Sequence, residues 1–389
     1  MRLSNGVCVN KAILYGAGIC GKLWYDCLMG YINITGFIDS NPQKQKDGYL
    51  SCSVYSVQKF QKIKTDDVTV IVSIGSEAEK SKIIKQMEEQ CGLKHKENLF
   101  DIREFLDELP DDEYLRIVYR KYIKKELNLE NPQTFNEKLQ WLKLYDRKSE
   151  YTMMADKYEV RKYIADKIGE EYLIPLIGVW DKFADIDFDQ LPSQFVLKCN
   201  RDSGSVVVCK DKNTYDFESA KFKLVKAFNY NYFYNFREWP YKNIIPKIIA
   251  EEYLYDLSGE INDYKLYCYN GKVKCTNVNS GRNSKSGVKY TFFDNDWNRL
   301  PFKCIYENDE RNISKPQYFE MMTNLAEKLA ANVPFLRVDF FEINKKLYIV
   351  ELTFYCEGGF GKFEPDLYDE MLGSWLILPK KNLIAHKKG

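Results

Sequence analysis

The chain has 389 residues, with 57 basic and 56 acidic side chains and a formal net charge of +1. A chain of this length exceeds one ordinary hydrophobic core, so two or three domains are expected. Because the charges nearly cancel, the composition argues against a general attraction to nucleic acid or to an anionic membrane.

The cysteine usage and the apolar pattern favour a cytoplasmic protein. Eleven cysteines lie in apolar stretches without paired CxxC spacing, which is typical of reduced cysteines that serve as small apolar residues. The segment MRLSNGVCVN lacks the apolar core of a signal peptide, and no run approaches the ~20 apolar residues that cross a bilayer. We therefore expect a soluble protein without membrane insertion.

The first domain, residues 1–107, has the pattern of a Rossmann-like parallel sheet. KAILYGAGICGKLWYDCL reads as a strand, a turn with Gly16, Gly18 and Gly21, and a helix whose N-terminus favours an anion. Asp39 ends the next strand, INITGFID, at the spacing of a ribose-binding acid. The pattern predicts that these four residues bind a nucleotide or nucleotide sugar. In the alternative, the glycines only pack the helix on the strand, and the pocket is empty or regulatory.

The second domain, residues 108–389, begins with a helical lead-in over residues 108–150. Within it, Thr134 and Glu137 predict a capping box. ADKYEVRKYIADKIG then reads as an amphipathic helix with Lys157 and Arg161 one turn apart on one face. The alternative for these two residues is a solvated basic stripe.

A pair of strands follows, in FVLKCNRDSGSVVVC, joined by the turn Ser203, Gly204 and Ser205. A turn of small residues can fold over phosphates and donate backbone N–H groups, while Lys198 supplies positive charge. The same pattern also fits an ordinary hairpin, because no GxxxxGK[ST] motif occurs.

The next strands carry charged residues at apolar positions. IIAEEYL reads as a buried strand that leads to a polar loop with Asp256 and Glu260. NDYKLYCYNGKVKCTNVNSGR predicts a hairpin around Asn270-Gly271, with Asp263, Lys265 and Arg282 on its strands or their ends. Each charge is explicable as an ion pair, but together they suggest a site for a polyanion and a metal.

The last predicted hairpin, in FLRVDFFEINKKLYIVELTFYCEGG, places two acids side by side. Asp339 lies on its first strand and Glu351 on its second. Two neighbouring buried carboxylates repel each other, and oxygen ligands on rigid strands suit Mg²⁺. The alternative is that one acid faces solvent and the other pairs with Arg337.

The order of these features resembles the TupA-like ATP-grasp family of bacterial surface-polysaccharide loci. The resemblance rests on NPQTFNEKLQWLKLYDR, ADKYEVRKYI, FVLKCN followed by DSGS, AEEYL, NDYKLYCYNG and VELTFYCEGGF, and covers residues 110–378. It implies an ATP-grasp fold, in which two α+β lobes clasp ATP.

The resemblance also implies roles for individual residues. Lys157 and Lys198 contact the phosphates, and the turn Ser203 to Ser205 closes over them. Adenine is met by the backbone of Glu252 and Leu254 and the side chain of Glu251, and ribose by Asp256 or Glu260. Mg²⁺ is held by Asp339 and Glu351, with Thr353 at a third position where many ATP-grasp enzymes have Asn.

The reaction implied is ATP-dependent ligation of a carboxylate to an amine through an acylphosphate, which forms an amide bond. The carboxylate would be a uronic acid or a related acid, in small-molecule or nucleotide-sugar form, for bacterial capsular polysaccharide, and the amine an amino acid or small amine. Arg282 and Arg337, whose guanidinium groups suit a carboxylate, and Lys265 are the catalytic candidates. The alternatives are a sugar or small-molecule kinase, a glycosyltransferase and a noncatalytic nucleotide sensor. A homo-oligomer is compatible with the sequence.

Overall fold

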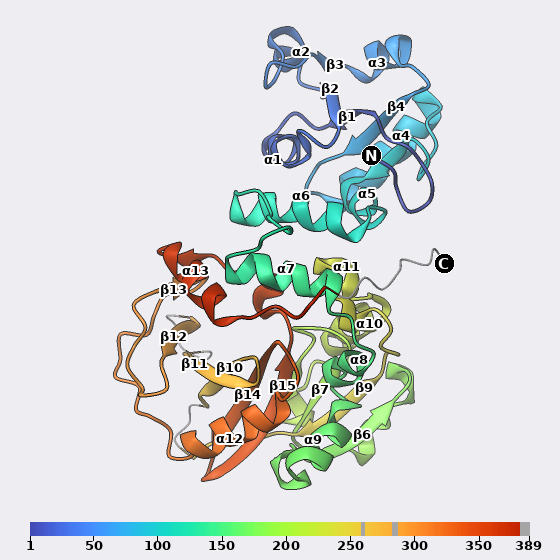
Figure 1. The fold of residues 1–389 in the computed structure, drawn as a ribbon. Coiled ribbons are helices and arrows are strands. Elements are labelled where there is room, and N and C mark those ends of the chain that lie inside the picture. Colours follow the sequence, from blue (N-terminus) through green and yellow to red (C-terminus); the bar gives the residue numbers. More distant parts are fainter. Residues whose placement is uncertain (258–260, 282–286, 382–389) are drawn as a thin grey trace. The chain divides into compact units, whose positions relative to one another are not determined.

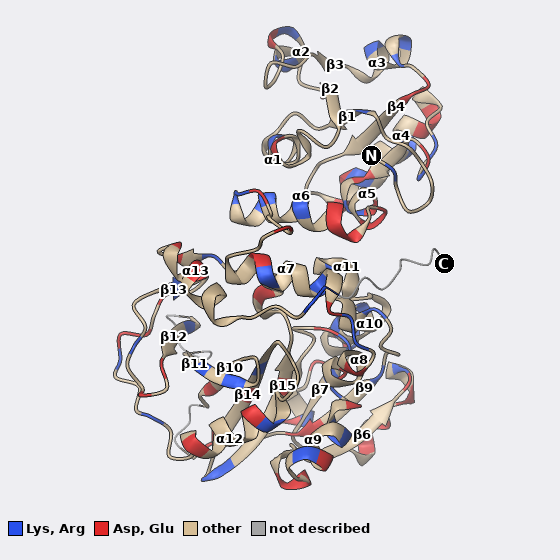
Figure 2. Cartoon of the chain, viewed as in Figure 1, with Lys and Arg blue, Asp and Glu red and all other residues tan. Residues whose placement is uncertain are grey.

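The computed structural model describes residues 1–257, 261–281 and 287–381. The chain divides into two compact units, Met1–Leu127 and Asn128–Gly389. The sequence interpretation places the boundary at residue 107, whereas in the structure helix α6 (Asp111–Ile123) also belongs to unit 1. Basic and acidic residues interleave along the elements of both units (Figure 2), as the nearly neutral composition predicts.

Unit 1 is a Rossmann-like domain (Figure 1). Its parallel sheet has the strand order β3-β2-β1-β4-β5. The elements are β1 (Lys11–Tyr15), α1 (Ile19–Leu28), β2 (Asn33–Ile38), α2 (Pro42–Asp47), β3 (Val54–Tyr55), α3 (Val57–Ile63), β4 (Val68–Val72), α4 (Glu77–Cys91), β5 (Leu99–Asp101), α5 (Ile102–Asp107) and α6 (Asp111–Ile123). The parallel sheet predicted from the sequence is confirmed.

The central strands of unit 1 are apolar because both faces of the sheet are covered. Every residue of β4 is buried, and the sequence VTVIV has the β-branched composition of such a strand. Ile13, Ile38 and Val70 form one core with Phe60 of α3 and Met87 of α4. This core fixes the carboxyl ends of β1 and β2, where the glycine turn and Asp39 lie.

Unit 2 contains two main antiparallel sheets in separate lobes (Figure 1). One has the strand order β6-β9-β7-β8 and the other β12-β11-β10-β14-β15. Its elements are α7 (Phe135–Tyr145), α8 (Glu150–Ala155), α9 (Val160–Ile168), β6 (Leu176–Trp180), β7 (Phe195–Cys199), β8 (Val207–Cys209), α10 (Phe217–Asn229), α11 (Phe233–Phe236), β9 (Ile248–Glu252), β10 (Asp263–Tyr269), β11 (Lys272–Ser280), β12 (Lys289–Phe293), β13 (Lys303–Cys304), α12 (Phe319–Leu329), β14 (Phe335–Ile343), β15 (Lys346–Thr353), β16 (Phe363–Glu364) and α13 (Leu367–Trp375).

The predicted hairpins and the predicted cap in unit 2 are confirmed. Asn344 and Lys345 have φ values of 48° and 65°, and Asn270 and Gly271 have 48° and 78°, which are the left-handed conformations of a tight hairpin turn. The capping box of Thr134 and Glu137 starts α7. A bridge between Leu173 and Ile349 of β15 links the lobes. The hairpin of β14 and β15 therefore lies where the lobes meet.

Candidate active site

The candidate site is built on one face of the five-stranded sheet. Opposite residues of antiparallel strands point to the same face, and the register places Asn277, Lys265, Asp339 and Glu351 in one row across β11, β10, β14 and β15. The next row contains Tyr267, Arg337 and Thr353 in the same way. Charges that lie far apart in the sequence therefore form one polar surface.

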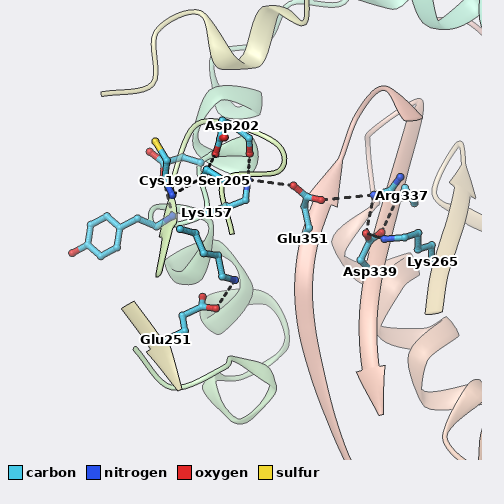
Figure 3. Close-up of polar contacts among 12 residues, drawn as sticks. Lys157, Cys199, Asp202, Ser205, Glu251, Lys265, Arg337, Asp339 and Glu351 are labelled. Carbon is cyan, nitrogen blue, oxygen red and sulfur yellow. Dashed lines mark hydrogen bonds and ion pairs between the residues drawn. The ribbon is translucent and has the colours of Figure 1, made fainter. Parts of the chain in front are cut away.

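Asp339 is the centre of this surface and is 1% exposed. Its two carboxylate oxygens accept hydrogen bonds from Nε and Nη2 of Arg337, at 2.7 and 2.8 Å, and one also pairs with the ammonium of Lys265 (Figure 3). Burial alone would raise the pKa of Asp339, but the charges of Arg337 and Lys265 outweigh it and hold this pKa below its ordinary value. Asp339 is therefore an anion at neutral pH.

Lys157 of the other lobe reaches toward Glu351. Its ammonium lies 3.4 Å from Oε1 of Glu351, while Nη2 of Arg337 lies 3.7 Å from Oε2 (Figure 3). Lys157 also donates a hydrogen bond to the carbonyl oxygen of Asp202. Burial would lower the pKa of Lys157, but the charges of Glu351 and Asp202 raise it above its ordinary value. A continuous chain of charges thus runs from one lobe to the other.

The structure corrects the prediction that Lys157 lies on a helix. α9 begins at Val160, and Lys157 lies in the turn between α8 and α9. The turn is held by Asp156, which accepts hydrogen bonds from the backbone N–H of Tyr158 and from the side-chain amide of Asn200, at 2.8 and 3.0 Å. The backbone N–H of Lys157 donates to the carbonyl oxygen of Asn200. These contacts aim Lys157 at the other lobe, and a solvated basic stripe is ruled out because its side chain is 12% exposed.

Lys198 and Glu251 form a buried ion pair on neighbouring strands β7 and β9. Nη1 of Arg161 lies 3.5 Å from Oε1 of Glu251, and Nη2 donates to the carbonyl oxygen of Ile174. Glu251 is thus surrounded by two cations. In this structure Lys198 is directed at Glu251, so both side chains are at the proposed nucleotide site but engage each other.

The turn between β7 and β8 has one buried and two exposed residues. Ser205 is buried, donates to Oδ1 of Asp202 at 2.6 Å and accepts from the backbone N–H of Cys199. Ser203 and Gly204 are exposed, and Gly204 has a φ of 97°. Ser205 therefore anchors the turn, and Ser203, which makes a side-chain hydrogen bond with Tyr232, forms its exposed tip with Gly204.

The predicted adenine-binding segment leaves the sheet where expected. β9 ends at Glu252, which is exposed, and Leu254 lies just beyond the strand. Further on, Oδ2 of Asp256 accepts from the backbone N–H of Asn344 at 3.1 Å, so this loop rests on the β14–β15 turn. Glu260 and Arg282, predicted to meet ribose and the substrate carboxylate, lie outside the described residues.

The donor set of the hairpin fits Mg²⁺ in part. Among the described residues, no group of three or more His, Cys, Asp or Glu side chains gathers as a metal site. A carboxylate offers about four lone-pair positions, and the three donors from Arg337 and Lys265 leave one on Asp339. Glu351, whose side chain is 25% exposed, adds a second carboxylate, and the buried hydroxyl of Thr353 has no hydrogen-bond partner. Two carboxylates with water and phosphate oxygens suit Mg²⁺.

In unit 1, the predicted glycines and Asp39 come together at one turn. Gly16 has a φ of 106°, and a Cβ on Gly21 would lie 1.8 Å from the carbonyl oxygen of Gly16. Asp39 accepts from the backbone N–H of Ala17 at 2.8 Å and lies 3.5 Å from the ammonium of Lys44. A Cβ on Gly18 would meet nothing within 4 Å, so the backbone there is open to a ligand.

Several buried polar residues near the candidate site were not predicted from the sequence. Asn277 is fully buried, and neither its amide oxygen nor its amide nitrogen has a hydrogen-bond partner among the described residues. Glu238 is 4% exposed, and its charge interacts with those of Glu351 and Arg337. The only sign of these residues in the sequence is that a polar residue stands inside an apolar or aromatic run. For Glu238 this run is NYNYFYNFREWPY.

Comparisons with known proteins agree with this arrangement. The TupA-like ATP-grasp family matches residues 137–377, more than half of the chain. The PglD N-terminal domain family matches residues 11–87. No curated protein matches the chain.

Three of the solved structures that match the chain are the following. N5-carboxyaminoimidazole synthetase from Staphylococcus aureus is 13% identical, with 91% of this chain and 72% of that chain covered and a TM-score of 0.32. D-alanine–D-alanine ligase from Bacillus anthracis complexed with ATP is 11% identical, with coverages of 89% and 85% and a TM-score of 0.31. D-alanine–D-alanine ligase from Helicobacter pylori is 14% identical, with coverages of 95% and 100% and a TM-score of 0.31. On the family match over most of unit 2, the chain belongs to the TupA-like ATP-grasp family.

Proposed function

We propose that this ATP-grasp enzyme joins a carboxylate to an amine through an acylphosphate. The observation that carries the proposal is the row of Lys265, Asp339 and Glu351, which meets Lys157 of the other lobe. Such a surface holds both charges that phosphoryl transfer needs, carboxylates for a metal and cations for the phosphoryl oxygens. The part of the chain that the structure describes offers no Ser-His-Asp set, since His95 is its one histidine.

In the first step, an oxygen of the substrate carboxylate attacks the γ-phosphorus of ATP, and ADP leaves. Lys157 and Lys198 neutralise the phosphate oxygens, and the exposed tip Ser203-Gly204 covers them with backbone N–H groups. Mg²⁺ bound by Glu351 and Asp339 would withdraw charge from the transferred phosphoryl group. Adenine lies against the segment from Glu251 to Leu254, and ribose near Asp256 or Glu260.

In the second step, the amine nitrogen attacks the acyl carbon, the bond to phosphate breaks, and the nitrogen loses a proton. Arg337 lies beside both carboxylates of the hairpin, so its guanidinium is placed to stabilise the negative charge of the tetrahedral intermediate. Lys265 keeps Asp339 and Arg337 in position and is the second cation of this face. Arg282 is proposed to hold the substrate carboxylate.

The substrate class follows from the family and from unit 1. We propose a uronic acid or related acid of a bacterial surface polysaccharide, with a nucleotide sugar held at Gly16, Gly18, Gly21 and Asp39. We also propose that the reaction takes place in the cytoplasm, where ATP and reduced thiols are found; the eleven free cysteines support this proposal. No helix in the described residues is both long and apolar enough to cross a bilayer.

The test is ADP release from Mg·ATP in the presence of uronic-acid nucleotide sugars, with and without mixed amino acids and small amines. ADP formation that requires both acid and amine, and a product lighter by one water than their sum in mass spectrometry, supports a ligase. A phosphorylated product without any amine requirement identifies a kinase and refutes the proposal. Nucleotide-sugar turnover without ATP refutes it in favour of a glycosyltransferase.

A further inference from the structure

Two carboxyl groups lie near Arg337 beyond those of the candidate site. They belong to Glu238, at the start of the Trp239–Tyr241 turn, and to Glu357, in the Cys356–Gly359 turn. The charges of Glu351, Glu357 and Arg337 all act on Glu238. The two carboxyl groups form an acidic area that suits a cationic group.

Glu238 is a buried carboxyl without a partner among the described residues. It is 4% exposed, and among the described residues its side chain makes no hydrogen bond or ion pair. A carboxyl buried in this way costs free energy unless a ligand satisfies it. Burial, with the charges of Glu351 and Glu357, raises the pKa of Glu238 to about 7. Such a rise is expected for a buried carboxyl that has no partner.

The nearest buried cation cannot supply that partner. Lys143 of α7 donates its three hydrogens to Oε1 of Gln140, the carbonyl oxygen of Phe236 and the carbonyl oxygen of Gly358, at 2.9, 2.9 and 2.6 Å. An ammonium has three donors, so none remains for Glu238. The same contacts fix the two segments that carry Glu238 and Glu357.

Glu357 is fixed by its backbone. Its φ of 51° and the φ of 61° at Gly358 form a left-handed turn, and Gln140 donates to the carbonyl oxygens of Gly358 and Gly359. The side chain is partly exposed. The turn therefore holds a second carboxyl near Glu238 at the margin of the candidate active site.

We propose that Glu238, with Glu357 beside it, forms the subsite that binds the ammonium group of the amine substrate. The proposal rests on the ligase function proposed above and assigns its second substrate: an amine that is cationic when it binds. The bound ammonium gives one proton to the Glu238 carboxylate before its nitrogen attacks the acyl carbon. Glu238 thereby determines specificity, because a neutral hydroxyl compound of the same shape leaves the buried carboxyl without a countercharge.

The test compares amines with their hydroxyl analogues on the full chain. The probes are glycine, L-alanine, L-glutamate and ethanolamine, paired with glycolate, L-lactate, L-2-hydroxyglutarate and ethylene glycol, in the presence of Mg²⁺ and a nonhydrolysable ATP analogue. Binding is measured by calorimetry and by the shift in melting temperature. At least one amine should bind the wild-type protein, and its hydroxyl analogue should bind at least about tenfold more weakly.

Glu238→Gln keeps the shape of the side chain and removes the charge. It should weaken binding of that amine at least about tenfold, while the affinity for the ATP analogue stays unchanged. Glu357→Gln should give a smaller loss in the same direction. Glu364→Gln is the matched control, because this residue is 59% exposed and pairs only with Lys362 among the described residues.

Three outcomes would overturn the proposal: equal binding of the amine to the wild-type and Glu238→Gln proteins, equal binding of amines and hydroxyl analogues, or no amine binding at all. The melting temperature of each unliganded variant shows whether it is folded. Failure of the ligase proposal is distinguishable, since a kinase would release ADP with a phosphorylated product whether or not Glu238 binds amines.

Discussion

Lys157 and Glu351 form an ion pair of 3.4 Å between the two lobes of unit 2. Each belongs to a different lobe, and each is proposed to act on the phosphates of ATP, one directly and one through a metal. The two side chains neutralise each other in this pair. If ATP binds as proposed, its phosphates and metal compete with this contact between the lobes, and the strength of the contact enters the affinity for ATP.

Replacing Lys157 should affect ATP use more than folding. Lys157→Met removes the cation that meets Glu351 and the phosphates, and we expect the KM for ATP to rise about 30-fold or more. Steady-state ADP release at varied ATP measures this. Lys362→Met is the control, because Lys362 is 64% exposed and pairs with the exposed Glu364. An unchanged KM and kcat in Lys157→Met would contradict the phosphate role.

Substitutions of the two hairpin acids should differ in their effect on the stability of the protein but not in their effect on its activity. Asp339→Asn leaves the buried Arg337 without its main anion and Lys265 with Asp263 as its remaining ion-pair partner. It should cost about 3 kcal/mol of folding free energy. Glu351→Gln should cost less than about 1 kcal/mol, because its side chain is 25% exposed. Both should abolish ATP turnover. Urea unfolding and ADP release, measured on both variants, separate these effects.

Full activity in either variant would refute the metal site. From the sequence alone, folding would be expected to survive both substitutions, since a pair with Arg337 was only the alternative for one of the acids and Lys265 was not identified as a partner of Asp339. The structure changes that expectation for Asp339 only.

The glycines of unit 1 offer a matched pair of substitutions. Gly21→Ala should destabilise unit 1, because the added Cβ would lie 1.8 Å from the carbonyl oxygen of Gly16. Gly18→Ala should leave the fold intact, since a Cβ there meets nothing within 4 Å, and should weaken nucleotide-sugar binding if a phosphate approaches this backbone. Thermal unfolding and binding of UDP-glucuronic acid check both. Unchanged binding in Gly18→Ala would argue for a purely structural turn.

Glu238 should make the stability of the protein depend on pH. Its ordinary pKa of 4.5 is raised to about 7 by burial and by the charges of Glu351 and Glu357, against the effect of Lys143. Between these values the folded state holds a proton that the unfolded chain has released, so this group lowers the free energy of unfolding as the pH rises.

Glu238→Gln removes that dependence. The variant should exceed the wild-type protein in stability by about 3 kcal/mol above pH 7, and the difference should vanish below pH 4.5. The other groups that act on Glu238 are Arg337, Tyr232 and Tyr241, which the substitution leaves in place. Urea unfolding at pH 5 and pH 8 measures the difference. A less stable variant at pH 8 would mean that the carboxylate has a stabilising partner.

The sequence predicts most of the architecture because local signals agree with the fold. Gly16, Gly18 and Gly21 mark the strand-to-helix turn of unit 1, and the alternating acids of the last hairpin predict that Asp339 and Glu351 face each other, as the register confirms. The start of α9 was predicted less well. Lys157 and Arg161 have the spacing of one helix face, but Asp156 and Asn200 hold Lys157 in a turn before the helix.

The partners of the charges could not be predicted because they come from distant segments. Nothing local indicates that Lys198 faces Glu251, since strand order and not spacing brings β7 beside β9. Glu238 lies in an aromatic run without periodicity, and only the structure reveals that its carboxyl is buried. Lys265 was identified as a charge in a strand, but its link to Asp339 needed the register of β10 and β14.

The three hydrogen bonds of Lys143 have a consequence for engineering. They tie the segment ending at Phe236 and the turn at Gly358 to a single helix, α7. Grafting either segment from a relative with another substrate would misplace its carboxyl unless the matching helix is transplanted too. Substrate specificity should therefore be transferable between members of the family when α7, the segment ending at Phe236 and the turn at Gly358 are exchanged together. Exchange of any one of these three segments alone should fail.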